Sequence, residues 1–276
     1  MSIDNYYVVF YKDNYELILT KVKNMRRFFI EEIDQKDGLC VISEKEAKHM
    51  IKVLRMKQGD TFILMDEKGN HFESVIENIS RYEISARIIK ELPKPSSSPV
   101  SINIYQAVLK PRMMDYMVEK TSELGVSAIL PFYSERTVVK LDDSKAVNKT
   151  RHWREIARSA SKQSGRLAPA EISGPIQFRD LIKSVGKIDS LKVVLWEAED
   201  ITDLKGLIRS QKPSPNFTGI IGPEGGFAGK EIDQLKDAGI IPVSLGSRIL
   251  RSETAAIALT TIIQYEWGDL GLIQIQ

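Results

Sequence analysis

The chain of 276 residues has 42% hydrophobic and 28% charged side chains, and its formal net charge is +2. These values are typical of a soluble globular protein with one large domain or two ordinary ones. The single cysteine, Cys40, excludes an internal disulfide and a cysteine-based zinc site, and we expect it to be a small core residue. No apolar run approaches the roughly 18 residues that a membrane-spanning helix needs. No basic region followed by an apolar segment marks the N-terminus, so we expect a reducing, cytoplasmic setting.

The first third of the chain predicts a small β-rich module. Residues 1–24 look separate from the rest of the chain and are interpreted as an N-terminal extension. Met25 opens a first strand-like run, and a serine and a glutamate three residues apart, Ser43 and Glu46, mark the start of a helix. Further strand patterns complete a module over 25–92, which we expect to be a barrel. These strand patterns cover residues 61–65, 72–79 and 82–92.

A stiff, polar linker at 93–99, rich in Pro and Ser, is the clearest domain boundary. After it the chain changes class, because strand-like and helical segments alternate. Such alternation predicts an α/β domain over 100–276 with a parallel sheet covered by helices. A stripe of three methionines and Val118 in its first helix is interpreted as core or an interface rather than a cofactor site. The expected strands are 102–109, 126–132, 191–196, 217–221 and 240–245, and the expected helices are 112–124, 145–164, 178–185, 229–238 and 252–267.

A basic stripe distinguishes the longest expected helix. From Lys145 to Arg166 there are seven basic residues and one acidic residue, Glu155. Such a stripe can follow a phosphate backbone, although a solvated helix face is the plainer interpretation of the same pattern. Trp153 falls on the apolar face of this helix, and we expect it in the core. Lys110 and Arg112 form a second basic spot after the first strand of the domain. The alternative is that they are ordinary charged residues of a surface loop.

Two glycine-bearing turns near the C-terminus carry most of the functional information. Gly222–Phe227 and Leu245–Ala255 each follow a strand-like run and lead into a helical pattern. This arrangement predicts one ligand cleft at the carboxyl ends of parallel strands. Glycine lets backbone N–H groups approach a ligand, and Pro223 stiffens the first turn, but a plain tight turn explains that segment equally well. Neither the phosphate-binding nor the dinucleotide-binding glycine pattern is matched.

The second turn ends in polar residues at the start of the last expected helix. Ser252 can cap this helix and Glu253 suits its dipole, which offers a purely structural role for each. Arg251 is harder to explain structurally, because a cation opposes the dipole at a helix N-terminus; we therefore expect a specific partner for it. Arg248 stays open between a structural and a functional role. The three histidines lack a metal-ligand pattern and no serine-hydrolase motif occurs, so neither a metal site nor that chemistry is expected.

Several motifs taken together resemble one known family. Apart from the two turns, they are Met25–Phe29, His49–Arg55, Glu119–Val126, Ser134–Arg136 and Gln163–Arg166. With them, the sequence from Met25 almost to the C-terminus is similar to the RsmE-type 16S ribosomal RNA uridine-N3 methyltransferases of the SPOUT superfamily. The two turns together are highly specific for this family, whereas either turn alone would be a moderately specific signal.

The resemblance implies a fold, a cofactor and partners. A PUA-like RNA-binding barrel would precede a SPOUT α/β domain with a C-terminal trefoil knot. S-adenosylmethionine would be the methyl donor, the substrate would be 16S ribosomal RNA of the small subunit, and the chain would form a homodimer. Two features depart from the family pattern. Residues 1–24 have no counterpart, and Ala228 stands where the family has a helix-capping Ser or Thr, which predicts a helix weaker by about 1 kcal/mol.

The resemblance also implies roles for single residues. The two turns would wrap the donor, and Arg251 would stabilise the uridine anion left when the N3 proton leaves. Glu224 is a weaker candidate for accepting that proton, with stabilisation of the turn as the alternative. The target base must be unpaired or flipped out to react. The implied cofactor-binding residues are Leu195, Gly222, Pro223, Glu224, Gly225, Gly226, Leu245, Gly246, Ile249, Leu250, Thr254 and Ala255. The implied RNA-binding residues are Arg26, Arg27, Lys52, Arg55, Lys110, Arg112, Arg158, Lys162, Gln163 and Arg166, and His49 would join those of the first module.

Two other classes of function stay open at this point. A non-catalytic RNA-binding factor in ribosome assembly would keep the basic surfaces but would bind no donor. A nucleotide-dependent enzyme would use the glycine turn for phosphate, although no lysine follows Gly225–Gly226.

Overall fold

The computed structural model describes residues 7–9, 18–20, 25–30, 38–66, 69–81, 83–92, 98–166 and 168–272. The chain divides into two compact units, one of residues 1–95 with 271–276 and one of residues 96–270. Most of the expected extension at 1–24 and residues 93–97 of the expected linker lie outside the described residues.

The first unit is built on a five-stranded sheet in the order β3-β5-β6-β7-β4. β3 pairs with β5 in parallel, and the other neighbours are antiparallel. A short helix followed directly by one π-helical turn lies between β4 and β5. Separately, β1 (Tyr7–Val9) pairs antiparallel with β2 (Ile18–Thr20). The remaining elements are β3 (Arg27–Phe29), β4 (Leu39–Ser43), α1 (Glu44–Lys48), η1 (His49–Val53), β5 (Thr61–Met65), β6 (His71–Ile79) and β7 (Glu83–Leu92).

The core cluster of this unit takes alternate residues from its strands, such as Phe62 and Leu64 of β5. Phe28 and Phe62 meet edge to face, with ring centroids 5.6 Å apart. Cys40 is buried on β4, as the sequence predicts, and its Sγ lies 3.5 Å from the carbonyl oxygen of Ala86. Burial raises the pKa of the Cys40 thiol to about 11, so the group stays neutral.

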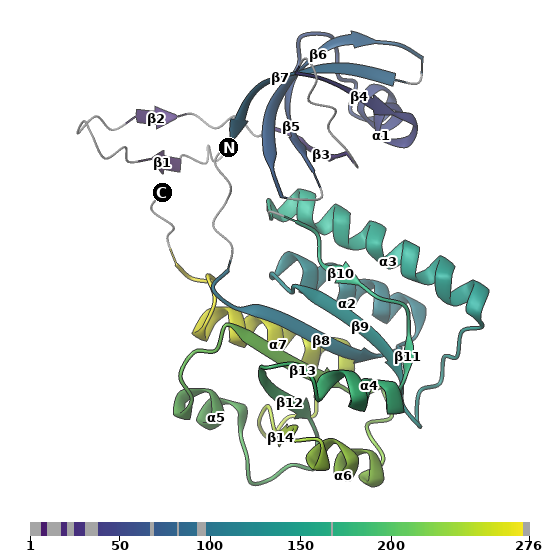
Figure 1. The fold of residues 1–276 in the computed structure, drawn as a ribbon, viewed down its shortest axis with the longest axis vertical. Helices are drawn as coiled ribbons and strands as arrows, with labels where there is room; N and C mark the ends of the chain where they lie inside the picture. The colour runs from purple at the N-terminus through teal and green to yellow at the C-terminus, as the bar shows by residue number, and fades with distance from the viewer. Residues whose placement is uncertain are drawn as a thin grey trace. The chain divides into compact units, whose positions relative to one another are not determined.

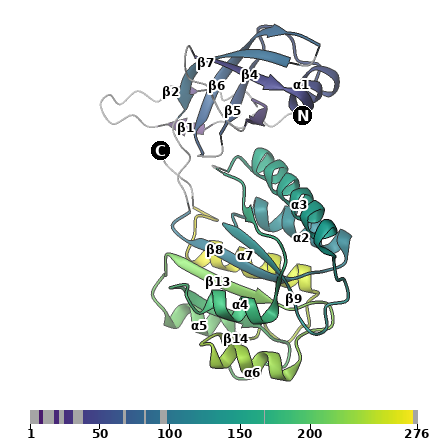
Figure 2. The same ribbon diagram turned by 45° about the vertical axis from the view of Figure 1, so that its right-hand side comes forward.

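The second unit contains a parallel sheet in the order β10-β9-β8-β13-β12-β14, with β11 also pairing with β9 (Figures 1 and 2). Every pairing in it is parallel, as expected for alternating strands and helices. Three short elements are absent from the sequence prediction: β10 (Glu171–Ile172), β11 (Ile176–Gln177) and α5 (Leu204–Ser210). The others are β8 (Ser101–Ala107), α2 (Pro111–Glu123), β9 (Ala128–Tyr133), α3 (Asp143–Ser164), α4 (Phe178–Val185), β12 (Leu191–Leu195), β13 (Asn216–Ile221), α6 (Gly229–Asp237), β14 (Ile241–Val243) and α7 (Ser252–Glu266).

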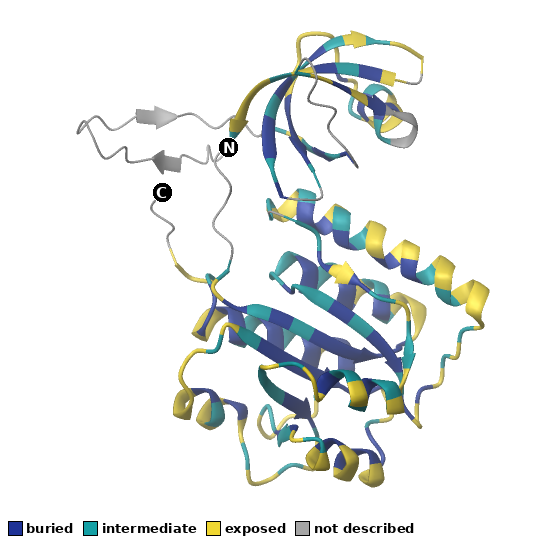
Figure 3. Cartoon of the chain, in the orientation of Figure 1, coloured by how far each residue is buried: buried dark blue, intermediate teal, exposed yellow. Residues whose placement is uncertain are grey.

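Helices cover both faces of this sheet, and the strands show why. Alternate residues of a strand point to opposite faces, so each central strand needs apolar residues at successive positions. On β13, Phe217 and Ile221 join the cluster beneath α2, α3, α5 and α7, whereas Ile220 joins the cluster beneath α4 and α6. Figure 3 shows the central strands as the most continuously buried part of this unit.

Two packing predictions for this unit are confirmed. Trp153 is buried on α3, and its indole N–H donates to the carboxylate of Asp115 on α2 at 3.1 Å. Met114 and Met117 are fully buried in the core beneath α2. The long helix therefore presents an apolar face to α2 and leaves its charged face outward.

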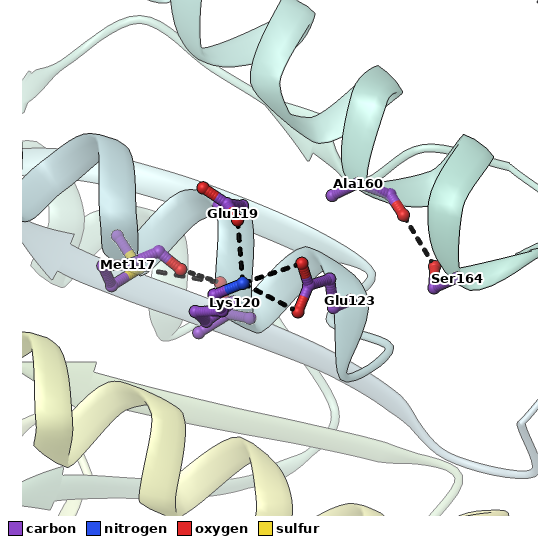
Figure 4. A network of polar contacts seen from close by, with 7 residues as sticks. Met117, Glu119, Lys120, Glu123, Ala160 and Ser164 are labelled. Carbon is purple, nitrogen blue, oxygen red and sulfur yellow. Dashed lines mark hydrogen bonds and ion pairs between the residues drawn. The ribbon is translucent and has the colours of Figure 1, made fainter. Parts of the chain in front are cut away.

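Lys120 lies on the outer surface of α2 between two glutamates (Figure 4). Its Nζ is 2.8 Å from Glu119 and 2.9 Å from Glu123. Hydrogen bonds from the ammonium to both carboxylates raise the pKa of Lys120 above its usual range. The positive charge of Lys120 is therefore already balanced within the helix.

Candidate functional site

A cavity of about 980 Å³ opens at the carboxyl ends of β12, β13 and β14. Three segments that come after these strands line it, and Lys110 and Met113 at the start of α2 complete it. Parallel strands place their carboxyl ends at one sheet edge, where α/β proteins bind their ligands. The lining segments fall within 195–203, 221–227 and 243–255.

The wall formed by residues 222–227 is called the glycine wall here. Gly226 has a φ of +68°, and a Cβ at this position would clash with the carboxylate of Glu197. The N–H of Gly226 donates to the carbonyl of Pro223 at 3.0 Å, which closes a tight turn. Phe227 then stacks on Phe132, with ring centroids 6.3 Å apart. Positive φ and close approach both require glycine here, so the turn has the backbone access that ligand binding needs.

Ser252 joins this wall to the start of α7, and the expectation that it caps the helix is wrong. Arg251 is the N-cap residue, and Ser252 is the first helical residue. The hydroxyl of Ser252 instead donates to the carbonyl of Gly222 at 2.5 Å and accepts from Gln106 Nε2 at 2.9 Å. Both side chains are buried. A contact between residues far apart in sequence thus replaces the local cap that the sequence suggests.

Two more side chains hold the glycine wall. Lys110 donates its backbone N–H to Glu224 Oε1 at 3.1 Å. Arg136 donates from Nη1 to the carbonyl of Gly225 at 3.0 Å. The contact to Lys110 is the turn-stabilising role that the sequence offered as the alternative for Glu224.

The missing cap at Ala228 is compensated by a glutamate. Ala228 is the N-cap of α6 and has no side-chain acceptor. The buried carboxylate of Glu231 accepts from the N–H of Ala228 at 2.9 Å and from the N–H of Glu135 at 2.9 Å. One half of a capping box is therefore present, and only the half that needs a hydroxyl is absent.

The opposite wall, residues 245–251, is called the arginine wall here. Arg248, Ile249 and Arg251 are exposed on it, and the side chain of Ile249 is 85% exposed. Within the part of the chain that the structure describes, the guanidinium of Arg251 forms no hydrogen bond or ion pair. As N-cap of α7, it lies where a cation opposes the helix dipole. The partner expected for Arg251 is thus not a described protein group.

The cavity brings together the residues that the resemblance assigns to cofactor binding, with one exception. Both wall segments line it, as do Leu195, Ala255 and the two catalytic candidates Arg251 and Glu224. Thr254 is exposed and does not line it. Sequence reasoning missed the third wall at 196–203 and the position of Glu253 on the cavity wall. The position of the third wall after an apolar strand was the signal that could have identified it.

The expected RNA-binding residues of the second unit differ in what they contact. Lys110, Arg112 and Gln163 are exposed, whereas Arg158 and Lys162 are half-buried. Arg166 donates from Nη1 to the carbonyl of Ser122 at 2.9 Å, and burial lowers its pKa. This contact closes the end of α2 and favours a structural role for Arg166.

The expected RNA-binding residues of the first unit form a separate set. Lys52 and Arg55 are exposed, and Arg55 has a φ of +53°, which is rare for a residue with a side chain. Arg26 donates from Nη1 to the carbonyl of Leu54 at 2.9 Å, which ties the first strand to the same turn. The Nε of Arg27 is buried without a partner among the described residues.

Comparison with known proteins identifies the family. A model described as an RNA methyltransferase domain matches residues 96–264, and one described as an RNA methyltransferase PUA domain matches residues 42–89. The chain belongs to the RsmE-type family of ribosomal RNA small subunit methyltransferases. The Ribosomal RNA small subunit methyltransferase E of Bacillus subtilis is 28% identical over 249 residues, covering 88% of this chain and 97% of the relative. That of Buchnera aphidicola from Schizaphis graminum is 31% identical, covering 90% and 99%.

Solved structures of the family share the fold. The methyltransferase E of Neisseria gonorrhoeae, bound to S-adenosyl methionine, superposes with a TM-score of 0.80 at 30% identity, covering 89% of this chain and 99% of that one. A Legionella pneumophila protein in complex with the bound cofactor SAM gives 0.82 at 32% identity, covering 90% and 100%. The α/β class with a parallel sheet and a PUA-like domain is therefore confirmed, whereas the trefoil knot stays a prediction.

Membrane-spanning helices and metal centres are both absent from the described residues. No helix among them is long and apolar enough to cross a membrane. No group of three or more His, Cys, Asp and Glu side chains in these parts of the chain is arranged to hold a metal ion.

Proposed function

We propose that this chain is an S-adenosylmethionine-dependent methyltransferase that acts on N3 of a uridine in 16S ribosomal RNA. One observation carries the proposal: the glycine wall and the arginine wall line a single cavity, and Arg251 lines it without a partner among the described residues. Family membership supports the methyltransferase class. Because the substrate is ribosomal RNA, a cytoplasmic setting follows.

The cavity fits the proposed donor. Its volume of about 980 Å³ lies at the upper end of the range for pockets that enclose a small ligand. Glycine at 222, 225 and 226 leaves backbone groups accessible on one side, and Leu195, Leu245 and Leu250 supply apolar contact. When bound, S-adenosylmethionine supplies a methyl group attached to a positively charged sulfur. Positioning donor and acceptor in line can contribute up to about 10 kcal/mol.

We assign to Arg251 the stabilisation of the acceptor, and its position on the cavity wall supports this. Uridine N3 carries a weakly acidic proton, and each unit by which the site lowers its pKa corresponds to about 1.4 kcal/mol. A guanidinium that lines the cavity stabilises the anion that remains. Glu224 stays the weaker candidate for accepting the proton, because one of its oxygens already accepts the N–H of Lys110.

The base must leave its stack before it can react, since N3 lies on the Watson–Crick edge. The surrounding RNA therefore needs its own contacts, which we assign to exposed basic residues. In the second unit, Lys110 and Arg112 lie beside the cavity at the start of α2. In the first unit, Lys52 and Arg55 are exposed around the turn after η1.

We also propose a homodimer, for which α7 provides the support. Residues 254–265 of this helix contain no charged side chain. Its outward positions are apolar or small: Ile257, Ala258 and Thr261 are half-buried, and Tyr265 is 67% exposed. A helix that is apolar on all sides is typical of a buried element, and a second copy covers it most simply. Light scattering should give twice the chain mass of 31.2 kDa, and Tyr265→Glu should give the monomer.

The proposed activity is tested with small ribosomal subunits from a strain that lacks its own enzyme. Incubation with the purified chain and S-adenosylmethionine should produce 3-methyluridine, measured by mass spectrometry of nucleosides from the 16S RNA. Arg251→Ala should fold normally and lose at least about 100-fold in rate, which corresponds to about 2.7 kcal/mol of transition-state stabilisation.

Arg248→Ala is the matched control, because Arg248 is exposed on the same wall. Its loss in rate should be much smaller. Full activity of Arg251→Ala would contradict the assigned role of this residue. A wild-type chain that binds the subunit but gives no saturable heat with S-adenosylmethionine would be a non-catalytic assembly factor instead.

A further inference from the structure

Two glutamates are buried among the described residues, and their surroundings differ. Glu231 is 4% exposed, and its two carboxylate oxygens accept backbone N–H groups from Ala228 and Glu135. Glu253 is 6% exposed, lies on the cavity wall and has no hydrogen bond or ion pair within the described parts of the chain. Only one of these two carboxylates is therefore satisfied by described protein groups.

Protein atoms cover most of the Glu253 side chain, but the residue lines the open cavity, and its oxygens are not among the fully buried, unpartnered atoms of the described residues. A carboxylate in such a partly enclosed site attracts a cation more strongly than one on the open surface, because the local dielectric is lower. Among the described residues, none of the three cations on the cavity wall, Lys110, Arg248 and Arg251, forms an ion pair with Glu253. A cationic group of a molecule that enters the cavity can therefore pair with Glu253.

The formal charges around the cavity agree with a cationic ligand. Six acidic side chains line it, against three basic ones. Three of the acids are already engaged with backbone N–H groups: Glu199 with Thr202, Asp203 with Gly206, and Glu224 with Lys110. Glu253 is the one whose side chain is mostly covered by protein while its carboxylate has no described partner.

We propose that Glu253 faces the positively charged sulfur of the donor and makes the pocket prefer S-adenosylmethionine over its neutral product, S-adenosylhomocysteine. This inference rests on the proposed function. Glu253 and Arg251 line the same cavity. With Arg251 assigned to the reacting base, the proposal assigns the carboxylate of Glu253 to the sulfur that carries the reacting methyl group.

The preference for the charged donor is useful because the reaction removes the positive charge from the sulfur. When the methyl group moves to N3, the sulfur–carbon bond breaks and its electron pair stays on the sulfur. The N3 proton leaves to Glu224, the candidate acceptor, or directly to solvent, and the electron pair that it leaves on N3 forms the new nitrogen–carbon bond. The sulfur thereby becomes a neutral thioether, and the attraction to Glu253 ends. Product release is favoured by the loss of the contact that held the donor.

Isothermal titration of the full chain with three ligands tests this. The ligands are S-adenosylmethionine, S-adenosylhomocysteine and sinefungin, which carries a protonated amine in place of the sulfonium. Glu253→Gln should weaken both cationic ligands about tenfold or more while changing the neutral product less than about threefold. Asp200→Asn is the matched control, because it removes one charge from an exposed position on the same cavity and should keep the wild-type preference.

The outcomes separate this inference from the proposed function. A wild-type chain that binds none of the three ligands overturns the proposed function. A wild-type chain that binds them, with an equal loss for all three in Glu253→Gln, overturns the role at the sulfur and indicates the shared methionine end instead. Should Glu253→Gln fail to fold, Glu253→Asp keeps the charge and must keep the preference; a folded Glu253→Asp without preference contradicts the proposal.

Discussion

The two walls of the cavity differ in how the protein holds them. The glycine wall is anchored at several points: Gly222 accepts from Ser252, Gly225 accepts from Arg136, and Phe227 stacks in the core. The arginine wall has exposed side chains at Arg248 and Ile249, and the charge of Arg251 has no partner among the described residues. One wall is thus held by contacts within the protein, while the other presents side chains without such contacts. This division agrees with the roles proposed for them, a fixed backbone that positions the donor and a charge that acts on the acceptor.

The largest expected effect comes from releasing the anchor between the walls. Ser252→Ala removes the hydroxyl that donates to Gly222 and accepts from Gln106, which leaves the Gly222 carbonyl only a long 3.4 Å contact from Gln106. Leaving buried polar groups unpaired costs about 1–3 kcal/mol. Thermal unfolding should show a lower Tm, by about 2–4 °C for each kcal/mol in a unit of this size. Donor affinity should fall with it.

Ser247→Ala is the control for this substitution, because Ser247 is exposed on the arginine wall. Its Tm and donor affinity should stay close to wild type. A Tm of Ser252→Ala equal to that of Ser247→Ala would show that the link between the walls contributes nothing to stability.

A smaller effect is expected from adding a side chain to the glycine wall at a position whose backbone conformation favours glycine. Gly226→Ala places a Cβ at a φ of +68° and forces the Glu197 carboxylate aside. A side chain in this backbone region costs about 1–2 kcal/mol. Since the strain acts at the pocket, titration should show donor affinity reduced by about tenfold for each 1.4 kcal/mol.

Gly229→Ala is the comparison for Gly226→Ala, because a Cβ there meets nothing within 4 Å. Gly229 is the first residue of α6, and Gly229→Ala should keep or slightly raise the free energy of unfolding. Equal donor affinity for the two variants would mean that the backbone shape of the glycine wall is not needed for binding.

The contrast between the walls also shows where sequence reasoning succeeds. The central strands and long helices were predicted within a few residues, because apolar runs that fill a buried sheet dominate their sequence, as in Phe217–Ile221. The shared cavity came from the rule that parallel strands end at one edge. Short elements such as Glu171–Ile172 carry too few residues for a pattern, and their pairing with β9 forms only in the folded chain.

What the sequence could not supply were partners distant along the chain. Ser252 has the residue type of a cap, yet its hydroxyl donates a hydrogen bond to a carbonyl 30 residues away. Glu253 suits the helix dipole, and only the tertiary structure shows that it lines the cavity without a described protein partner. Local propensity thus predicts where an element begins, whereas the tertiary contact decides what its first residues do.

The smallest expected effect is a gain in stability at the end of the glycine wall. Ala228→Ser supplies a hydroxyl that accepts the N–H of Glu231, while the Glu231 carboxylate already accepts the N–H of residue 228. Completing this capping box should stabilise the chain by about 0.5–1 kcal/mol, measured as a higher urea midpoint at unchanged slope. Ala238→Ser, at the other end of α6, is the control and should bring no gain.

Because Ala228→Ser lies behind the glycine wall and adds no group to the cavity, donor affinity should stay at the wild-type value. A lower urea midpoint would mean that the buried site lacks room for the hydroxyl, and that Glu231 alone is the better solution at this position.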